Sequence, residues 1–150
     1  MFKKILACLD GSKFAEQILP YAAEQAARFD SELVLLCVLS TLDLPIAAGI
    51  GSQEYVKKQI QAEEGIKAYL KGLAEEVSPG RDVRLETLVV DGTVGAHIVS
   101  YAEENGIDLI AIATHGQGGV KRLAFGSVTD YVLRNSAIPM LVIRPIAGDK

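Results

Sequence analysis

Five short apolar runs, separated by stretches with helical periodicity, constrain the fold of this chain more than any other feature. Each run has the length of one buried strand, and together they cover residues 5–9, 33–39, 83–90, 109–113 and 140–143. Strands that alternate with helices favour a parallel sheet covered on both faces. We therefore predict an α/β fold: an open, five-stranded, mostly parallel sheet with helices on both faces, of the Rossmann-like kind.

Two helices are predicted in the first half of the chain. One begins after Ser12, a residue type favoured as an N-cap, and continues to Phe29. Pro20 lies inside this stretch, and we expect a local kink there because an interior proline removes one backbone hydrogen bond. The other covers residues 54–77 and is long and amphipathic. Its apolar face is predicted to contain Ile60, Ile66, Tyr69, Leu70, Leu73 and Val77.

Two further helices are predicted in the second half. The pattern over residues 94–105 indicates a helix that Gly106 ends as its C′ residue. The last helix follows Gly126, where Ser127 and Asp130 have the spacing of a capping box.

Composition limits the classes of protein to consider. Of the 150 residues 49% are hydrophobic, which fits one packed core, so we predict a single domain over residues 1–150. A net charge of -4 argues against nucleic-acid and anionic-membrane partners. Asp10 interrupts the N-terminus before a signal-peptide core forms, and no run reaches the length of a membrane span. Cys8 and Cys37 lie in apolar runs, so we expect reduced core thiols and a cytoplasmic protein.

A glycine-rich connection joins the fourth predicted strand to the last helix. Gly116, Gly118 and Gly119 have no Cβ, so their amides can converge on an anion. Gly126 and Ser127 then open a helix whose first amides are unpaired and carry partial positive charge. The connection is therefore either a phosphate site or ordinary strand-to-helix punctuation.

Asp10 adds a carboxylate at the same edge of the predicted sheet. Asp10 follows the first strand and Val38 ends the second, so both should meet the glycine-rich connection where the strand order reverses. A carboxylate at that point can accept a ribose hydroxyl or help to hold Mg²⁺. Asp-Gly-Ser is also good turn chemistry, so Asp10 is alternatively a turn former.

Several catalytic patterns are missing. The sequence contains no P-loop, no dinucleotide fingerprint after the first strand and no Gly-x-Ser-x-Gly elbow. His97 falls inside a helix and is interpreted as a packing or surface residue, and His115 has no carboxylate near it in sequence to support a general base. Lys121 and Arg122 either offset phosphate charge or are solvated. Residues 40–53 are either a lid or a loosely packed loop.

The motifs together resemble those of the universal stress protein family, of the adenine-nucleotide-binding kind. The resemblance covers nearly the whole chain. It is carried by Cys8-Leu-Asp10-Gly-Ser12, by Leu33-Val-Leu-Leu-Cys-Val38, by Thr114-His-Gly116 through Gly126-Ser-Val-Thr129, and by Ile138-Pro-Met-Leu-Val-Ile-Arg144-Pro145. The family pattern is a glycine, two residues, a glycine, nine residues, then a glycine with Ser or Thr. Ala113 stands where that pattern has its first glycine, and Gln117 stands where relatives often have a basic residue.

The resemblance implies a fold like that of the adenine nucleotide alpha hydrolases and a site for ATP or AMP, with Mg²⁺ as a further ligand through Asp10. It assigns Asp10 and the Val38 backbone to ribose and adenine. The phosphates would lie against Ala113, Gly116, Gly119, Gly126, Ser127 and Val128. It also implies a homodimer that joins through the last strand, from Met140 to Arg144.

Three functions remain open at this point. The first is a nucleotide-binding stress-response regulator with little or no catalysis and an unidentified protein partner. The second is an enzyme that cleaves ATP to activate a substrate, or hydrolyses it slowly. The third is a dimeric interaction module without nucleotide, because the Ala113 methyl occupies space that the family leaves to the ligand.

Overall fold

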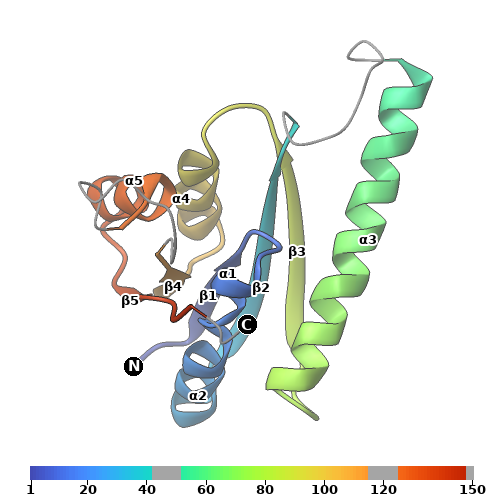
Figure 1. Ribbon diagram of the computed structural model, residues 1–150. Helices are drawn as coiled ribbons and strands as arrows, with labels where there is room; N and C mark the ends of the chain where they lie inside the picture. The colour runs from blue at the N-terminus through green and yellow to red at the C-terminus, as the bar shows by residue number, and fades with distance from the viewer. Residues whose placement is uncertain (42–51, 115–124, 148–150) are drawn as a thin grey trace.

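The computed structural model describes residues 1–41, 52–114 and 125–147, and these residues form one parallel sheet with helices on both faces (Figure 1). The strands are β1 (Lys4–Leu9), β2 (Glu32–Ser40), β3 (Val83–Val90), β4 (Leu109–Ala113) and β5 (Met140–Ile143). Their order in the sheet is β3-β2-β1-β4-β5, and every adjacent pair is parallel. The predicted open α/β fold is confirmed.

The helices form two layers. In chain order they are α1 (Lys13–Glu16), α2 (Leu19–Phe29), α3 (Gln53–Val77), α4 (Val94–Glu104) and α5 (Ser127–Asn135). The first three cover one face of the sheet, and α4 and α5 cover the other (Figure 1). Among the described residues, no helix is both long and apolar enough to cross a membrane.

Strand β1 supplies both halves of the core. Successive side chains of a strand point to opposite faces, so Ala7 and Leu9 pack with α1 to α3 whereas Leu6 and Cys8 pack with α4 and α5. All four are nearly inaccessible to solvent because β1 lies between β2 and β4 and is covered from both sides. This explains why the strand is an almost continuous apolar run.

Pro20 divides the first predicted helix instead of kinking it. The helical pattern is broken between Glu16 and Leu19, and Pro20 occupies the first turn of α2. In a first turn the missing N–H of proline costs no hydrogen bond, because the first amides of a helix have no partner within it. The expectation of one kinked helix is therefore wrong.

The helix ends agree with the sequence in part. Ser12 caps α1 as predicted, with its Oγ accepting a hydrogen bond from the Ala15 amide at 3.1 Å. Gly106, with a φ of 63°, follows the end of α4 as predicted. The capping box at Ser127 is wrong, because Gly126 is the N-cap of α5 and Ser127 is its first helical residue.

The amphipathic pattern of α3 is confirmed except at one position. Ile66, Tyr69 and Leu70 pack toward the sheet, but Ile60 is 50% exposed. Six residues at 3.6 per turn separate Ile60 from Ile66 by about 240°, so the two cannot share a narrow face. Ile60 instead lies on the outer side of the helix.

Candidate functional site

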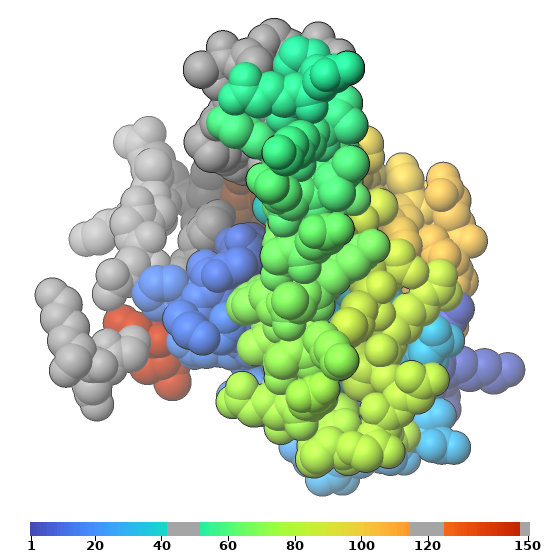
Figure 2. All heavy atoms as spheres, turned by 90° about the vertical axis from the view of Figure 1, so that its right-hand side faces the viewer, coloured from blue at the N-terminus to red at the C-terminus, as the bar shows by residue number. Residues whose placement is uncertain are grey.

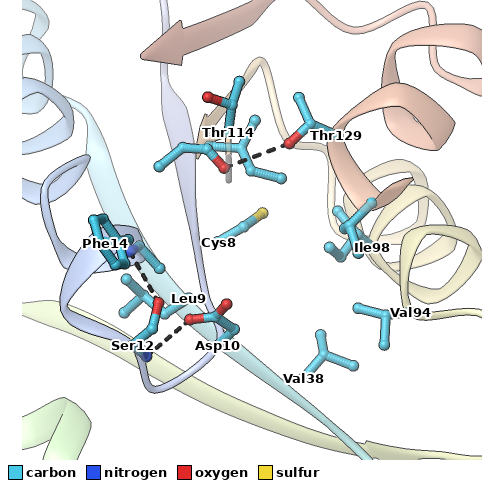
Figure 3. A pocket seen from close by; sticks show the side chains of 14 residues that line it. Cys8, Leu9, Asp10, Ser12, Phe14, Val38, Val94, Ile98, Thr114 and Thr129 are labelled. Carbon is cyan, nitrogen blue, oxygen red and sulfur yellow. Dashed lines mark hydrogen bonds between the residues drawn. The ribbon is translucent and has the colours of Figure 1, made fainter. Parts of the chain in front are cut away.

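A cleft opens at the carboxyl ends of β1 and β4, where the strand order reverses. From β1 the chain proceeds to β2 and β3 on one side of the sheet, and β4 and β5 lie on the other. Ligands of open α/β sheets bind at such a switch point. The cleft encloses about 550 Å³, including space open to solvent, and Figure 3 shows its side chains. It is lined by Cys8, Leu9, Asp10, Ser12, Phe14, Ala15, Val38, Val94, Ile98, Ile112, Ala113, Thr114, Val128 and Thr129.

Asp10 both forms a turn and faces the cleft. Its Oδ1 accepts a hydrogen bond from the Ser12 amide at 2.8 Å, which holds the turn between β1 and α1. The Asp10 side chain nevertheless lines the cleft beside Ser12 (Figure 3). Its other oxygen, Oδ2, accepts no hydrogen bond from a described residue, so both interpretations of Asp10 apply together.

The wall opposite Asp10 is apolar. Val38 comes from the end of β2, and Val94 and Ile98 come from the first turns of α4, one helical turn apart (Figure 3). Cys8 lies between the two sides, and burial raises the pKa of its thiol to about 12. A thiol with that pKa stays protonated at neutral pH, so the wall presents no charge to a ligand.

Two threonines lie at the β4 end of the cleft. The Thr129 Oγ1 donates a hydrogen bond to the Ala113 carbonyl at 3.4 Å, which joins α5 to the last residue of β4. The Oγ1 of Thr114 is buried and makes no hydrogen bond with a described residue. A buried hydroxyl without a partner loses free energy unless a ligand or water pairs with it. Thr114 therefore offers a hydroxyl to a ligand in the cleft.

The first turn of α5 begins beside these threonines. Gly126 has φ 76° and ψ 161°, a combination that only glycine adopts without strain. Ser127 is exposed, and its side chain makes no hydrogen bond with a described residue. The amides of the first turn, which have no partner within the helix, and this hydroxyl form an end of α5 that favours an anion.

The structure brings together half of the predicted site residues. Asp10, Val38, Ala113 and Val128 all line the cleft. Two more, Gly126 and Ser127, begin α5 next to the lining residue Val128 but are not part of the lining itself. The predicted phosphate ligands Gly116 and Gly119 lie outside the described residues, as do His115, Gln117, Lys121 and Arg122 and most of the 40–53 segment.

Sequence reasoning missed other lining residues. Cys8 was interpreted as a core thiol, and it is indeed buried and reduced, but it also faces the cleft. Strand alternation could have found it, because Cys8 lies two residues before Asp10, which the sequence placed at the site. Val94 and Ile98 follow the i, i+4 spacing of a helix face, and both were predicted to lie in a helix but not at the site. Within the described ranges, no three His, Cys, Asp or Glu side chains gather as a metal site.

The fold and the position of the cleft define a doubly wound α/β protein with a cleft at its switch point. The family model described as "Universal stress protein family" matches residues 1–144. The universal stress protein MJ0531 of Methanocaldococcus jannaschii is 31% identical over 146 residues, which cover 96% of this chain and 83% of the relative. The chain belongs to the universal stress protein family.

Solved structures share the fold. The structure of MJ0577, also from Methanocaldococcus jannaschii, has a TM-score of 0.78 and 26% identity and covers 99% of both chains. A universal stress protein in complex with cAMP has a TM-score of 0.68 at 18% identity, over 95% of this chain and 97% of that one. One from Archaeoglobus fulgidus in complex with dAMP has a TM-score of 0.58 at 19% identity, also over 95% and 97%.

Proposed function

We propose that this protein binds an adenine nucleotide, ATP or AMP, in the switch-point cleft and acts as a stress-response regulator with little or no catalysis. The observation that carries the proposal is the polarity of the cleft. An uncharged apolar wall lies opposite the Asp10 carboxylate, whereas the start of α5 and the Thr114 hydroxyl, which pairs with no described residue, lie at the β4 end (Figure 3). A nucleotide has the same division between its base and its ribose phosphate.

Each part of the nucleotide has a place in this proposal. The base packs against Val38 and the α4 side chains Val94 and Ile98. Apolar side chains of this kind line most pockets that bind flat ligands. The ribose hydroxyls donate to the free oxygen of Asp10. The phosphates extend toward Gly126 and Ser127, where the first amides of α5 are unpaired. Gly116 and Gly119 complete the phosphate site in this proposal.

The family comparison supports an adenine ligand. Two similar structures are complexes with cAMP and dAMP, both of which are adenine nucleotides. The Ala113 methyl lies within the cleft lining of this chain, so the phosphates must pass it at a greater distance than they would pass a glycine. We therefore expect binding to be retained and weaker than in members with glycine at this position.

Magnesium fits this site as a companion of the phosphates. Mg²⁺ is commonly held by substrate phosphates, waters and one or two carboxylates, and the described cleft offers the Asp10 carboxylate. When the ion is bound, Asp10 would hold it through Oδ2 in place of the ribose hydroxyls, and the ion would offset phosphate charge. The rest of the coordination would come from the nucleotide and from water.

We also propose that two copies pair through β5, from Met140 to Arg144, to form a homodimer. β5 is the last strand of the sheet, and its residues are only partly buried. An edge strand of this kind pairs readily with a second copy across a two-fold axis. The reduced, buried thiols of Cys8 and Cys37 suit the cytoplasm, where we place the protein.

Calorimetry with ATP, ADP and AMP tests nucleotide binding directly. Asp10→Asn should lower affinity about tenfold, because the amide still accepts the Ser12 hydrogen bond but loses the charge that attracts ribose hydroxyls and Mg²⁺. Asp82→Asn, which changes an exposed carboxylate at the opposite end of the sheet, should leave affinity unchanged. No binding of the unaltered protein at millimolar nucleotide would contradict the proposal and favour a nucleotide-free interaction module.

A phosphate-release assay separates the regulator from an enzyme. Turnover above about 1 per second, near the lower end of typical enzyme rates, would identify catalysis instead of slow hydrolysis. The described lining offers two groups that titrate, Asp10 and Cys8, and the Cys8 thiol is held neutral. We therefore expect at most slow hydrolysis.

A further inference from the structure

The outer face of α3 carries exposed aliphatic side chains that the described chain does not cover. Val56 is 48% exposed and Ile60 is 50% exposed, although both are β-branched residues of the kind usually buried. They lie one helical turn apart and line a shallow hollow together with Gln53, Lys57 and Gln61. Figure 2 views this side of the molecule and shows α3 as its outermost ridge.

Two charges on this part of α3 have no ion-pair partner in the described chain. Lys57 and Glu64 are both exposed on the outer side of α3, and neither makes an ion pair with a described residue. They lie seven residues apart, which is about two helical turns, so both project from one side of the helix. Ile60 lies between them on the same side.

This pattern is self-complementary under a two-fold axis. If two copies of α3 lie antiparallel with Ile60 facing Ile60, each step toward the C-terminus of one helix is a step toward the N-terminus of the other. Lys57 of each copy then lies level with Glu64 of the other copy, on the same side of the helix pair. The contact contains two opposite-charge pairs around one aliphatic centre, as an isologous interface requires.

We propose that the outer face of α3, residues 53–68, is a self-association surface on which a second copy of this chain docks antiparallel. The surface is separate from the proposed β5 pairing, because α3 and β5 lie on opposite sides of the molecule (Figure 1). Both contacts can therefore form at once, and dimers joined through β5 then assemble further through α3. One helix pair is a small interface, so this step depends on protein concentration.

Charge reversal combined with mixing tests the proposal. Sedimentation equilibrium of the full chain at low salt, over increasing concentration, should show an average mass that rises beyond that of the dimer. Lys57→Glu and Glu64→Lys should each weaken this step about tenfold, because both pairs become repulsive. The two variants mixed together should associate as tightly as the unaltered chain, because every Glu then meets a Lys.

Two further variants distinguish the surface from general effects of charge and apolar area. Lys71→Glu makes the same charge change on an exposed residue of α3 beyond residues 53–68 and should leave the mass unchanged. Ile60→Asp should abolish the concentration-dependent step while leaving the far-ultraviolet circular dichroism unaltered, because the side chain is half exposed. The proposal is overturned if Lys57→Glu and Ile60→Asp self-associate as tightly as the unaltered chain, or if the mixed variants fail to associate.

Nucleotide affinity provides an independent check. Val56, Ile60 and Lys57 do not line the switch-point cleft, so their variants should bind nucleotide as the unaltered chain does. Failure of self-association with intact nucleotide binding would overturn this inference alone. Loss of nucleotide binding in the unaltered chain would leave it untouched.

Discussion

The side chain of Gln17 pairs with both main-chain groups of Ile146. Its Nε2 donates to the Ile146 carbonyl at 2.7 Å, and its Oε1 accepts from the Ile146 amide at 2.9 Å. The side-chain amide therefore makes the same pair of hydrogen bonds with Ile146 that a residue of a neighbouring strand would make. It fixes the chain that leaves β5 against the break between α1 and α2, close to the helix that carries Ser12 and Phe14 of the cleft.

Gln17→Ala should lower the free energy of unfolding by about 1 kcal/mol, because two exposed hydrogen bonds are lost and water replaces them in part. Urea unfolding followed by circular dichroism measures the change. Gln25→Ala is the matched control, since Gln25 makes no hydrogen bond with a described residue and should change stability little. Equal stability of the two variants would show that the Gln17 pairing contributes nothing.

Gly126→Ala should both destabilise the fold and weaken nucleotide binding. A non-glycine residue at φ 76° and ψ 161° costs about 1 to 3 kcal/mol, and relief of that strain moves the first amides of α5. Gly80→Ala is a control for strain alone, because Gly80 has the same φ of 76° and lies between α3 and β3, away from the cleft. Calorimetry should find reduced affinity in the first variant only.

Gly95→Ala should force α4 and α5 apart. A Cβ on Gly95 would lie 2.8 Å from Cδ1 and 2.9 Å from Cβ of Tyr131, closer than real Cβ atoms approach. Overpacking of this kind costs about 1 to 3 kcal/mol. Because α4 and α5 both contribute to the cleft, nucleotide affinity should fall as well.

The opposite result is expected at Gly72. No described atom lies within 4 Å of the place where its Cβ would be, so Gly72→Ala should stabilise α3 by about 1 kcal/mol. Thermal unfolding of Gly72→Ala and Gly95→Ala therefore distinguishes two effects. One is the close approach of α4 and α5 at Gly95, and the other is the general effect of removing a glycine from a helix. Stabilisation of both variants would refute the tight packing of Gly95 against Tyr131.

Stability should fall as the pH rises above 9.0. Burial raises the pKa of the Cys8 thiol from 9.0 to about 12, so the unfolded chain releases this proton at a lower pH than the folded chain does. The folded state then binds more protons, and the free energy of unfolding decreases with pH between these two values. Burial and, to a lesser degree, the charge of Asp10 raise the pKa of Cys37 to about 11, which adds to the effect.

Urea unfolding of Cys8→Ala at pH 8 to 10 measures the contribution of this thiol. The variant should lose less stability over the range than the unaltered chain, although it begins less stable because a buried sulfur is removed. Identical pH slopes in the two proteins would show that Cys8 titrates normally in the fold.

Local physics determined most of the sheet in advance. Residues 83–90, 109–113 and 140–143 were predicted with the bounds that the structure has, because mainly apolar runs of strand length between polar or turn-forming segments leave few alternatives. Ser12 as an N-cap and Gly106 as a C′ residue were also correct, since each depends on backbone groups a few residues away. The parallel order and the switch point then placed Asp10 and Val38 at one edge.

The predictions that failed concern contacts between distant parts of the chain and the residues at which helices begin. Val94 and Ile98 reach the cleft only because α4 packs beside α5, a contact that no local pattern encodes. Ser127 was predicted as the N-cap because Asp130 follows it at the spacing of a capping box. In the structure Gly126, with its positive φ, is the N-cap, so α5 begins one residue earlier than predicted. Pro20 was predicted to lie inside a helix, but it lies in the first turn of α2. The sequence pattern does not distinguish the two cases, because they differ only in the residue at which the helix begins.

The central position of β1 has a consequence for synthesis on the ribosome. β1 is made first, but one of its edges waits for β4, and the cleft needs residues as far apart as Cys8 and Thr129. A nascent chain that ends before β4 therefore has an exposed apolar edge on β1, and one that ends before α5 has no finished pocket. Nucleotide captured during translation would report that the polypeptide has been completed to its last helix.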